Sequence, residues 1–532
     1  MTDKGLDKKI RDNGFMSGVL VLSLSAIIVK IIGLVYKIPM LKLLGSEGMG
    51  YFNSAYEIYT LFCIVATTGL PVAMSVMISS GKGGAERIFR VAMRIFLMLG
   101  VVGCAVMIGL ARPFSEFLGS EKTVFCIFAI SPTVFLICLS SAYRGFFQGH
   151  GKMLPTAVSQ VIEALGKLIL GLIFAFVALG GGASVEVVAA FAVFGLTVGE
   201  AVSVLYLMLS KRLSADKAVG CCAAIEKNDR EIAGLLMKTA IPVTLSAAVI
   251  SLTKVIDMTM ILRRLQDLGY SSEQAFAAYG SYTTLALPLF SLAPALVASV
   301  AMPLIPSLSE AIAQRDDGKQ KRVVASALRL TSMISMPISA GLSLFARPIL
   351  ELVFRGEDEA IALASPLLVV LGLSVTSACL ITVGNAVLQA YSKAYVPIIS
   401  MAVGSALKIA LAYLLIGNAE IGIWGAPIST FVCDLIINIV NFCYIAKVMP
   451  DIPSIREVFV MPFAASAVSV VWARVAYNVL AKRVTEGAFV TIGCIALAGL
   501  IYLPLIFIFR VIKKEEMSEM PILNRLVSVK NK

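Results

Sequence analysis

The stretch Leu22–Pro39 reads LSLSAIIVKIIGLVYKIP, which has the length and apolar character of a membrane-spanning helix. Lys30 lies in its middle, with about nine apolar or small residues on either side. Placing a lysine at the centre of a bilayer costs roughly 3 kcal/mol on insertion scales. A lysine at this depth therefore points to a functional site, where it meets water or an anion.

The composition of the whole chain indicates an integral membrane protein. Of its 532 residues, 58% are hydrophobic and 15% are charged, whereas soluble proteins carry about 25% charged residues. The net charge is +12, but the basic residues lie in short loops between apolar runs and form no continuous stripe. This distribution is typical of membrane topology and argues against a nucleic-acid partner.

Apolar runs of sufficient length predict about fourteen transmembrane helices. They begin near residues 15, 51, 88, 122, 155, 186, 235, 276, 323, 361, 395, 421, 456 and 487. Sorting Lys and Arg by loop places roughly thirty on the side of the N-terminus and about ten on the other side. We therefore expect both termini to be cytoplasmic, with the first span retained because no cleavage site follows it.

The two halves of the chain resemble each other. LARPFSEFL (110–118) recurs as FARPILELV (345–353), and QGHGKMLP (148–155) recurs as QAYSKAYVP (389–397). Each half holds six spans, an even number, so both copies start on the same side of the membrane. The repeat predicts two parallel six-helix bundles related by a pseudo-two-fold axis along the membrane normal.

The longest polar connection follows the sixth span and separates the halves. We predict an N-terminal lobe over 1–210, a cytoplasmic linker over 211–238 and a C-terminal lobe over 239–447. Two additional transmembrane helices over 448–512 and a cytoplasmic tail over 513–532 would complete the chain.

Four lysines within predicted spans are candidates for a cationic cavity that binds an anionic substrate. Under the duplication, Lys30 in span one lies opposite Lys254 in span seven, so both ammonium groups would point into one cavity if the bundles face each other. Asp257 lies one turn from Lys254, so a local ion pair between the two is the alternative to a cavity role for Lys254. Lys167 likewise follows Glu163 at the i, i+4 spacing that favours a helix pair. Its counterpart Lys408 lacks a local acid and is the better cavity candidate.

Acidic residues in the spans would counter these lysines or carry a coupling ion. They are Glu57, Glu163, Glu200, Asp257 and Asp434. Pro71 at the end of span two and Pro294 in the proline-rich span eight are predicted to be hinges or gates, because prolines loosen helices near cavities and moving parts. Arg144 is assigned to the same group of hinge or gate residues.

No catalytic or metal-binding pattern is found. The outer loops are short, a phosphate-binding G-x-x-x-x-G-K-[ST] loop is missing, and no pair of the ten cysteines has metal-ligand spacing. We expect a protein that is not an enzyme and uses no cofactor. Energy would come from a Na+ or H+ gradient or from the membrane potential.

Two segments carry a resemblance to a known family. They are LLGSEGMGYFNSAYEIYTLFCIVATTGLPVAMS (43–75) and YRGFFQGHGKMLPTAVSQVIEALGK (143–167). Together with the six-plus-six-plus-two arrangement, they resemble the polysaccharide-biosynthesis transporters of the stage V sporulation protein B type. These are relatives of the MurJ flippases in the multidrug/oligosaccharidyl-lipid/polysaccharide (MOP) exporter superfamily.

The resemblance implies a V-shaped, two-lobed helical fold in a bacterial cytoplasmic membrane, working by alternating access. It implies a polyprenyl-diphosphate-linked glycan as substrate, similar to lipid II, whose diphosphate enters a cationic cavity. The two extra helices would receive the lipid tail. Membrane lipids and the cell-wall synthesis machinery are the implied partners, and the identity of the glycan stays open.

Three other functions were weighed. A multidrug exporter of the same superfamily would have twelve spans and place acids in its cavity. A membrane glycosyltransferase or polymerase would need a catalytic acid in a sizeable outer loop. A scaffold without transport activity would gain nothing from charges inside the membrane.

Overall fold

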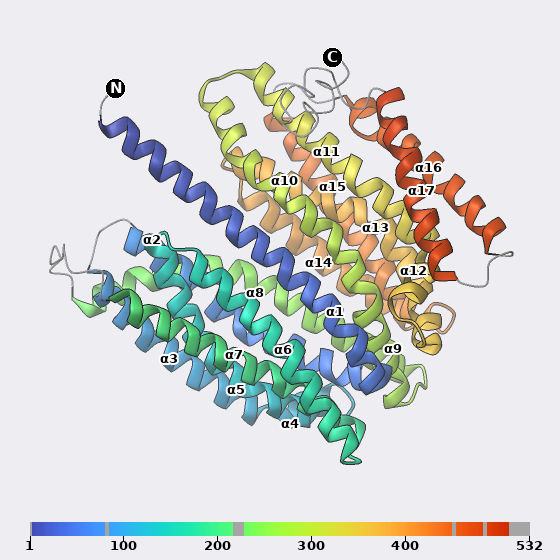
Figure 1. The fold of residues 1–532 in the computed structure, drawn as a ribbon, viewed down its shortest axis with the longest axis horizontal. Helices are drawn as coiled ribbons and strands as arrows, with labels where there is room; N and C mark the ends of the chain where they lie inside the picture. The colour runs from blue at the N-terminus through green and yellow to red at the C-terminus, as the bar shows by residue number, and fades with distance from the viewer. Residues whose placement is uncertain (1–2, 80–83, 216–227, 450–453, 482–486, 510–532) are drawn as a thin grey trace. The chain divides into compact units, whose positions relative to one another are not determined.

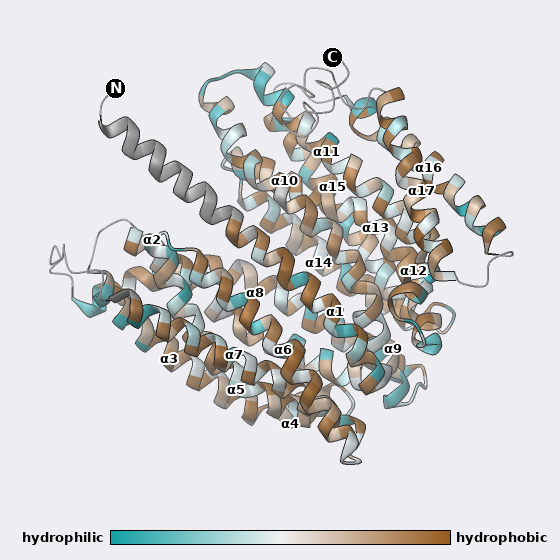
Figure 2. Ribbon diagram, in the orientation of Figure 1, coloured by the Kyte–Doolittle hydropathy of each residue, from teal (hydrophilic) through white to brown (hydrophobic). Residues whose placement is uncertain are grey.

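A computed structural model describes residues 3–79, 84–215, 228–449, 454–481 and 487–509, and this part of the chain is helical without strands (Figure 1). Thirteen helical stretches are long and apolar enough to cross a membrane, and the first, Leu24–Ser79, covers the first two predicted spans. The predicted all-α membrane fold is confirmed. Apolar residues run along most of each helix, and hydrophilic residues gather chiefly at helix ends (Figure 2).

The first two predicted spans are joined without a loop. Helix α1 (Asp3–Thr67) has non-helical backbone at Gly45, where φ is 66° and ψ is 179°. A side chain at positive φ is strained, so glycine suits this break. Helix α2 (Gly69–Ser79) then completes the second span after a one-residue interruption.

The contacts within the chain divide it into two units, and each is described by itself. Unit 1 comprises residues 1–284 and 412–423. After α1 and α2 it holds α3 (Ala85–Gly109), α4 (Ala111–Phe117), α5 (Thr123–Gly149), α6 (Leu154–Gly180), α7 (Val185–Ala215), α8 (Asp229–Asp267) and α9 (Ser272–Ser281). Within it, α1 packs against α5, α6, α7, α8 and α9.

Unit 2 comprises residues 285–411 and 424–532. A π-helix, η1 (Tyr282–Ala286), leads into it. Its elements are α10 (Leu287–Ala313), α11 (Asp317–Leu344), α12 (Ala346–Val353), α13 (Asp358–Ala390), most of α14 (Tyr395–Ile416), α15 (Gly425–Val448), η3 (Arg456–Val460), α16 (Met461–Leu480) and α17 (Gly487–Ile508). A single 3-10 turn, η2 (Gly422–Trp424), precedes α15. Helix α13 packs against α10, α11 and α15 and so occupies the centre of the unit.

The element order confirms the internal repeat. The series α3 to α7 and the series α11 to α15 both read long helix, short helix and three further long helices. The short members α4 and α12 hold the two copies of the Ala-Arg-Pro motif, with Arg112 in one and Arg347 in the other.

The proposed domain limits stay predictions. The contact division falls at Thr284 and groups α8, the seventh predicted span, with the first unit. Part of the predicted linker, residues 216–227, and the whole predicted tail, 513–532, lie outside the described residues.

The two additional helices are fastened to unit 2 by polar contacts as well as by apolar packing. Tyr502 of α17 donates a hydrogen bond to the Met333 carbonyl oxygen at 2.9 Å. Arg329 of α11, whose side chain is 4% exposed, pairs with Glu457 of η3 at 3.4 Å. Phe345 packs in a core cluster formed by α16 and α17.

Facing glycines set the spacing of α6 and α7 in unit 1. A Cβ atom added to Gly195 would lie 2.3 Å from the Gly171 backbone, and one added to Gly166 would lie 2.4 Å from Gly199. Small residues at such interfaces let helix backbones approach closely in membranes. This contact brings the polar residues beside these glycines, including Glu200 and Lys167, into the same layer of unit 1.

Candidate functional site

A buried charge network lies at the centre of unit 1. Arg144 of α5 donates hydrogen bonds to Glu163 Oε2 and to Ser159 Oγ, each at 3.0 Å, and to Ser203 Oγ at 3.4 Å. Its guanidinium also lies 3.9 Å from Glu200 Oε2, and the Glu200 side chain is 0% exposed. Neither Glu200 oxygen has a hydrogen-bond partner among the described residues. Arg144 is therefore the counter-charge for two carboxylates on α6 and α7.

This network changes the closest partner expected for Glu163. Glu163 pairs with Arg144 at 3.0 Å and lies within electrostatic range of Lys167, although no ion pair joins it to Lys167 among the described residues. The role of Arg144 as a hinge or gate stays a prediction, because the structure shows only its pairing.

Lys167 instead points into a cage of aromatic rings. Its Nζ lies 4.4 Å from the ring centre of Tyr56, 5.1 Å from that of Tyr36 and 5.3 Å from that of Phe52. A cation over a ring face is attracted by the ring quadrupole, with about 0.5–2 kcal/mol per favourable pair. The rings hold the ammonium at a fixed place without neutralising its charge.

Lys37 belongs to the same region, and the sequence reasoning missed it. It donates a hydrogen bond to the Thr283 carbonyl oxygen at 2.7 Å and lies within electrostatic range of Lys167 and Glu57. The signal was present, since Lys37 follows Lys30 by seven residues and shares its face of α1. Asn53 holds the same turn in place, because its side-chain amide donates hydrogen bonds to the hydroxyls of Thr283 and Thr284, each at 2.9 Å.

The lysine predicted on span seven also reaches this region. Glu57 of α1 lies within electrostatic range of Lys254, Lys37 and Asp257. The Lys254 and Lys30 side chains are both exposed. Lys30 and Lys254, placed opposite each other by the repeat, therefore belong to the same unit of the structure.

Unit 1 thus carries four lysines within its long apolar helices. Lys37 and Lys254 lie within electrostatic range of Glu57, Lys167 lies within that of Glu163, and Lys30 shares the face of α1 that carries Lys37. Lysines in such a setting can bind an anion, because partly desolvated ammonium groups gain more from a phosphate or carboxylate than they do in water.

In unit 2, the predicted candidate Lys408 lies within electrostatic range of Asp434 on α15. Beside them, Asn441 accepts a hydrogen bond from Ser400 at 2.8 Å and donates one to Asn385 at 2.9 Å. Lys408 thus has an acid on a neighbouring helix, although it has none within its own. This arrangement favours a structural polar core for the unit.

The two predicted proline hinges lie in different settings. Pro71 is buried in α2, just after the interruption that separates α2 from α1. Pro294 lies inside α10, which continues through three internal prolines. The irregular backbone near it is the π-helix η1, which precedes the prolines. A hinge function at either position stays a prediction.

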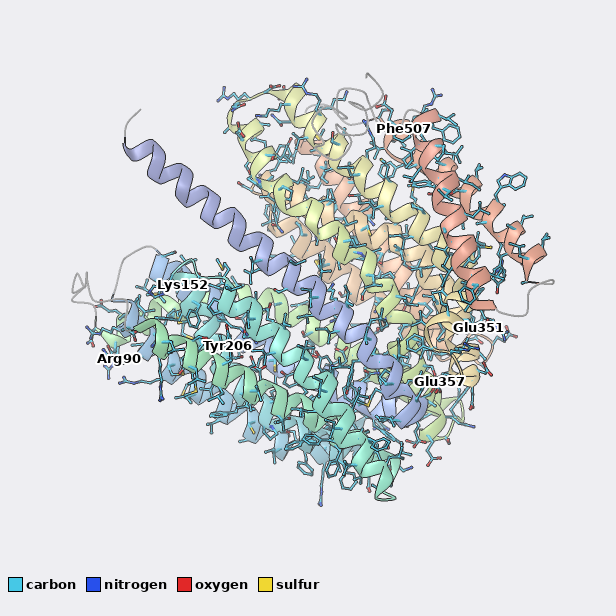
Figure 3. All side chains as sticks on the ribbon, viewed as in Figure 1. Arg90, Lys152, Tyr206, Glu351, Glu357 and Phe507 are labelled. Atoms are coloured by element: carbon cyan, nitrogen blue, oxygen red, sulfur yellow. The ribbon has the colours of Figure 1, made fainter. Side chains whose placement is uncertain are left out.

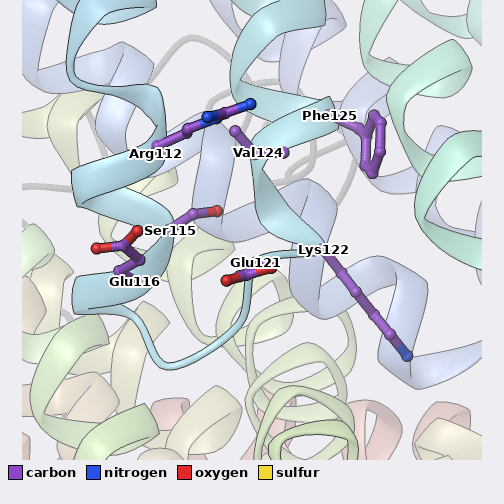
Figure 4. A pocket seen from close by; sticks show the side chains of 7 residues that line it. All are labelled: Arg112, Ser115, Glu116, Glu121, Lys122, Val124 and Phe125. Atoms are coloured by element: carbon purple, nitrogen blue, oxygen red, sulfur yellow. The ribbon is translucent and has the colours of Figure 1, made fainter.

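None of these lysines lines the cavity at the other end of α5. It has a volume of about 510 Å3 and lies between α4 and the start of α5 (Figure 4). Arg112 extends across it toward Val124, while the Lys122 side chain points away and binds Glu273 at 2.9 Å. That hydrogen bond raises the pKa of Lys122. Its lining mixes two basic with two acidic residues, so it shows no preference for an anion.

Within the described residues, no group of three or more His, Cys, Asp or Glu side chains could hold a metal ion. The candidate site is built from ammonium, guanidinium and carboxylate groups, together with the aromatic rings around Lys167. Its chemistry is binding and charge compensation.

Comparisons with known proteins agree with the fold. The chain is 26% identical over 530 residues to stage V sporulation protein B of Bacillus subtilis (strain 168), covering 96% of this chain and 99% of that protein. It is also 26% identical over 425 residues to the lipid II flippase MurJ of the same organism, covering 74% and 76%.

Solved structures are similar as well. A structure titled lipid II flippase MurJ, inward closed conformation, matches with a TM-score of 0.71 at 16% identity, covering 92% of this chain and 98% of that chain. An inward-facing multidrug resistance MATE family transporter of the MOP superfamily matches with a TM-score of 0.64 at 18% identity, covering 81% and 97%.

Two family models match parts of the sequence. The MatE model matches residues 242–414, and the polysaccharide biosynthesis protein model matches residues 15–312, more than half of the chain. The resemblance to transporters is thus confirmed, and with it the expectation that the protein is not an enzyme. The chain is a multi-pass membrane transporter of the MOP superfamily and belongs to the polysaccharide biosynthesis protein family.

Proposed function

We propose that this protein is a flippase that moves a polyprenyl-diphosphate-linked glycan, similar to lipid II, from the inner to the outer leaflet by alternating access. The observation that supports it is the presence of four lysines, Lys30, Lys37, Lys167 and Lys254, in the long apolar helices of unit 1. A diphosphate would bring negative charge to them, and its oxygens accept hydrogen bonds from ammonium groups.

The relatives support the same class of substrate. A protein named lipid II flippase is similar to this chain in sequence, and a structure of that name shares its fold. The two additional helices α16 and α17 would give the lipid tail a surface, with exposed Phe463, Trp472 and Phe489 among their residues. The protein would act in the bacterial cytoplasmic membrane, with both termini cytoplasmic and the cell-wall synthesis machinery as its partner.

Coupling to an ion would use the carboxylates. The Arg144 network holds two acids around one cation, and the buried Glu200 would take up or release a proton if Arg144 moved. A Na+ gradient or the membrane potential would drive the same cycle through other carboxylates. No cofactor takes part.

The test is translocation of a lipid-linked disaccharide-pentapeptide in proteoliposomes. We expect wild-type protein to transport it and the double variant Lys30→Gln/Lys254→Gln to lose most of that transport. Lys152→Gln, in the exposed turn between α5 and α6 (Figure 3), removes one lysine charge outside the site and should transport normally. Full transport by the double variant would contradict the proposal.

A second candidate function is export of organic cations, which the match to the MatE model supports. The acids of unit 1 would then bind the substrate. The same vesicles distinguish the two functions, because uptake of ethidium without movement of the lipid-linked glycan would favour the exporter.

A further inference from the structure

A second basic site lies at the first turns of α3, apart from the lysines described above. Arg87, Arg90 and Arg94 are spaced by three and four residues and so share one face of the helix. They line a cavity of about 280 Å3 together with Val91 and with Asp229, the first residue of α8. Arg90 projects from this end of unit 1 (Figure 3).

The charges of this cavity are not balanced. Asp229 accepts from Arg87 Nε at 2.8 Å and lies 3.3 Å from Arg94 NH1, so one carboxylate is shared by two guanidinium groups. Arg90 forms no ion pair within the described part of the chain. The side chains of Arg87 and Arg94 are 41% and 71% exposed, which leaves their remaining N–H groups open to a ligand.

The same face of α3 continues as an exposed apolar stripe. Leu97 is 37% exposed, Met98 62%, Val101 57% and Val102 54%, all directly after Arg94. In a membrane-spanning helix such a stripe faces lipid chains, and arginines at its end reach the level of the head groups. The basic site and the lipid-facing stripe therefore form one continuous surface along α3.

We propose that this site binds the phosphate of an anionic phospholipid, whose chains lie along the apolar stripe of α3. Guanidinium groups suit phosphate because they donate two parallel hydrogen bonds to its oxygens. Asp229 holds Arg87 and Arg94 in place while leaving the cavity with a net positive charge. By the distribution of basic residues, the lipid belongs to the cytoplasmic leaflet. The site would fasten unit 1 to that leaflet, separately from the transported substrate.

The test uses a tryptophan reporter, Leu97→Trp, in vesicles of phosphatidylcholine with a minor share of brominated phosphatidylglycerol or brominated phosphatidylcholine. Protein without the reporter corrects for Trp424 and Trp472. We expect the brominated phosphatidylglycerol to quench the reporter more strongly. The preference of the site for phosphatidylglycerol over phosphatidylcholine should fall about fivefold in Arg90→Gln and by a further factor of about five in Arg90→Gln/Arg94→Gln. A fivefold change is about the contribution of one basic residue near an anionic surface.

The matched control is Arg112→Gln/Arg355→Gln, which removes two exposed arginines elsewhere and should leave the preference unchanged. Equal quenching by the two brominated lipids in the unsubstituted site would overturn the proposal. So would a preference that survives in Arg90→Gln/Arg94→Gln protein that elutes as a single folded species. Displacement of the lipid by dilute inorganic phosphate would assign the site to a free anion and overturn its lipid assignment.

Discussion

Replacing Arg144 with methionine removes the cation that Glu163 and Glu200 share. The Arg144 side chain is 11% exposed and that of Glu200 is 0% exposed, so solvent compensates little for the lost charge. Breaking a buried pair by removing one partner costs about 3–5 kcal/mol, because the other charge is left uncompensated. We therefore expect Arg144→Met to lower the free energy of unfolding by about that amount.

The measurement is unfolding in mixed micelles titrated with sodium dodecyl sulfate. The matched control is Arg347→Met, which breaks an Arg–Glu pair of 2.7 Å that is 70% exposed on the arginine side. Exposed pairs contribute little, so this variant should unfold almost like the wild type. The triple variant Arg144→Met/Glu163→Gln/Glu200→Gln should regain most of the lost stability. Equal stability of Arg144→Met and Arg347→Met would refute the reasoning.

Two further predictions concern unit 1. Gly195→Ala should destabilise the protein by about 1–3 kcal/mol, because the new Cβ meets the Gly171 backbone. The control Gly180→Ala should leave the stability unchanged, because nothing lies within 4 Å of the added Cβ atom. Similar melting midpoints for the two variants would argue against the close approach of α6 and α7. Lys167→Met should keep the fold but slow transport of the lipid-linked glycan at least about tenfold, because it removes an ammonium group proposed to bind the diphosphate, and a tenfold loss corresponds to roughly 1.4 kcal/mol. Tyr56→Leu should slow it less, since two rings remain, and an unimpaired Lys167→Met protein would exclude this lysine from the site.

The sequence predicted the helices well because a bilayer leaves few choices. An apolar run of about 20 residues in lipid must be helical, since its backbone groups find no other partners. The predicted starts near residues 122, 155 and 186 lie within one residue of the observed starts of α5, α6 and α7. The break at Gly45 was not predicted, because a single glycine in an apolar run does not reveal a positive φ.

The site was predicted less completely. Lys30, Lys167 and Lys254 were proposed from the sequence because each charge stands out in an apolar run, and their role in a site stays a prediction. The pairing of Glu163 with Arg144 was not predicted, because helical spacing reports only neighbours on the same helix and Arg144 comes from α5. The aromatic cage of Lys167 was not predicted for the same reason. Its three rings all belong to α1 and contact Lys167 of α6 only through tertiary packing.

Binding of a short polyprenyl diphosphate tests the central claim most directly. Purified protein in detergent would be titrated with the diphosphate and with the matching polyprenol, which shares the chain but lacks the charge. We predict that wild-type protein and Lys152→Gln prefer the diphosphate strongly, and that Lys37→Gln/Lys254→Gln loses this preference while still binding the polyprenol. An undiminished preference for the diphosphate in that double variant would contradict the assignment of the unit 1 lysines as the anion-binding site.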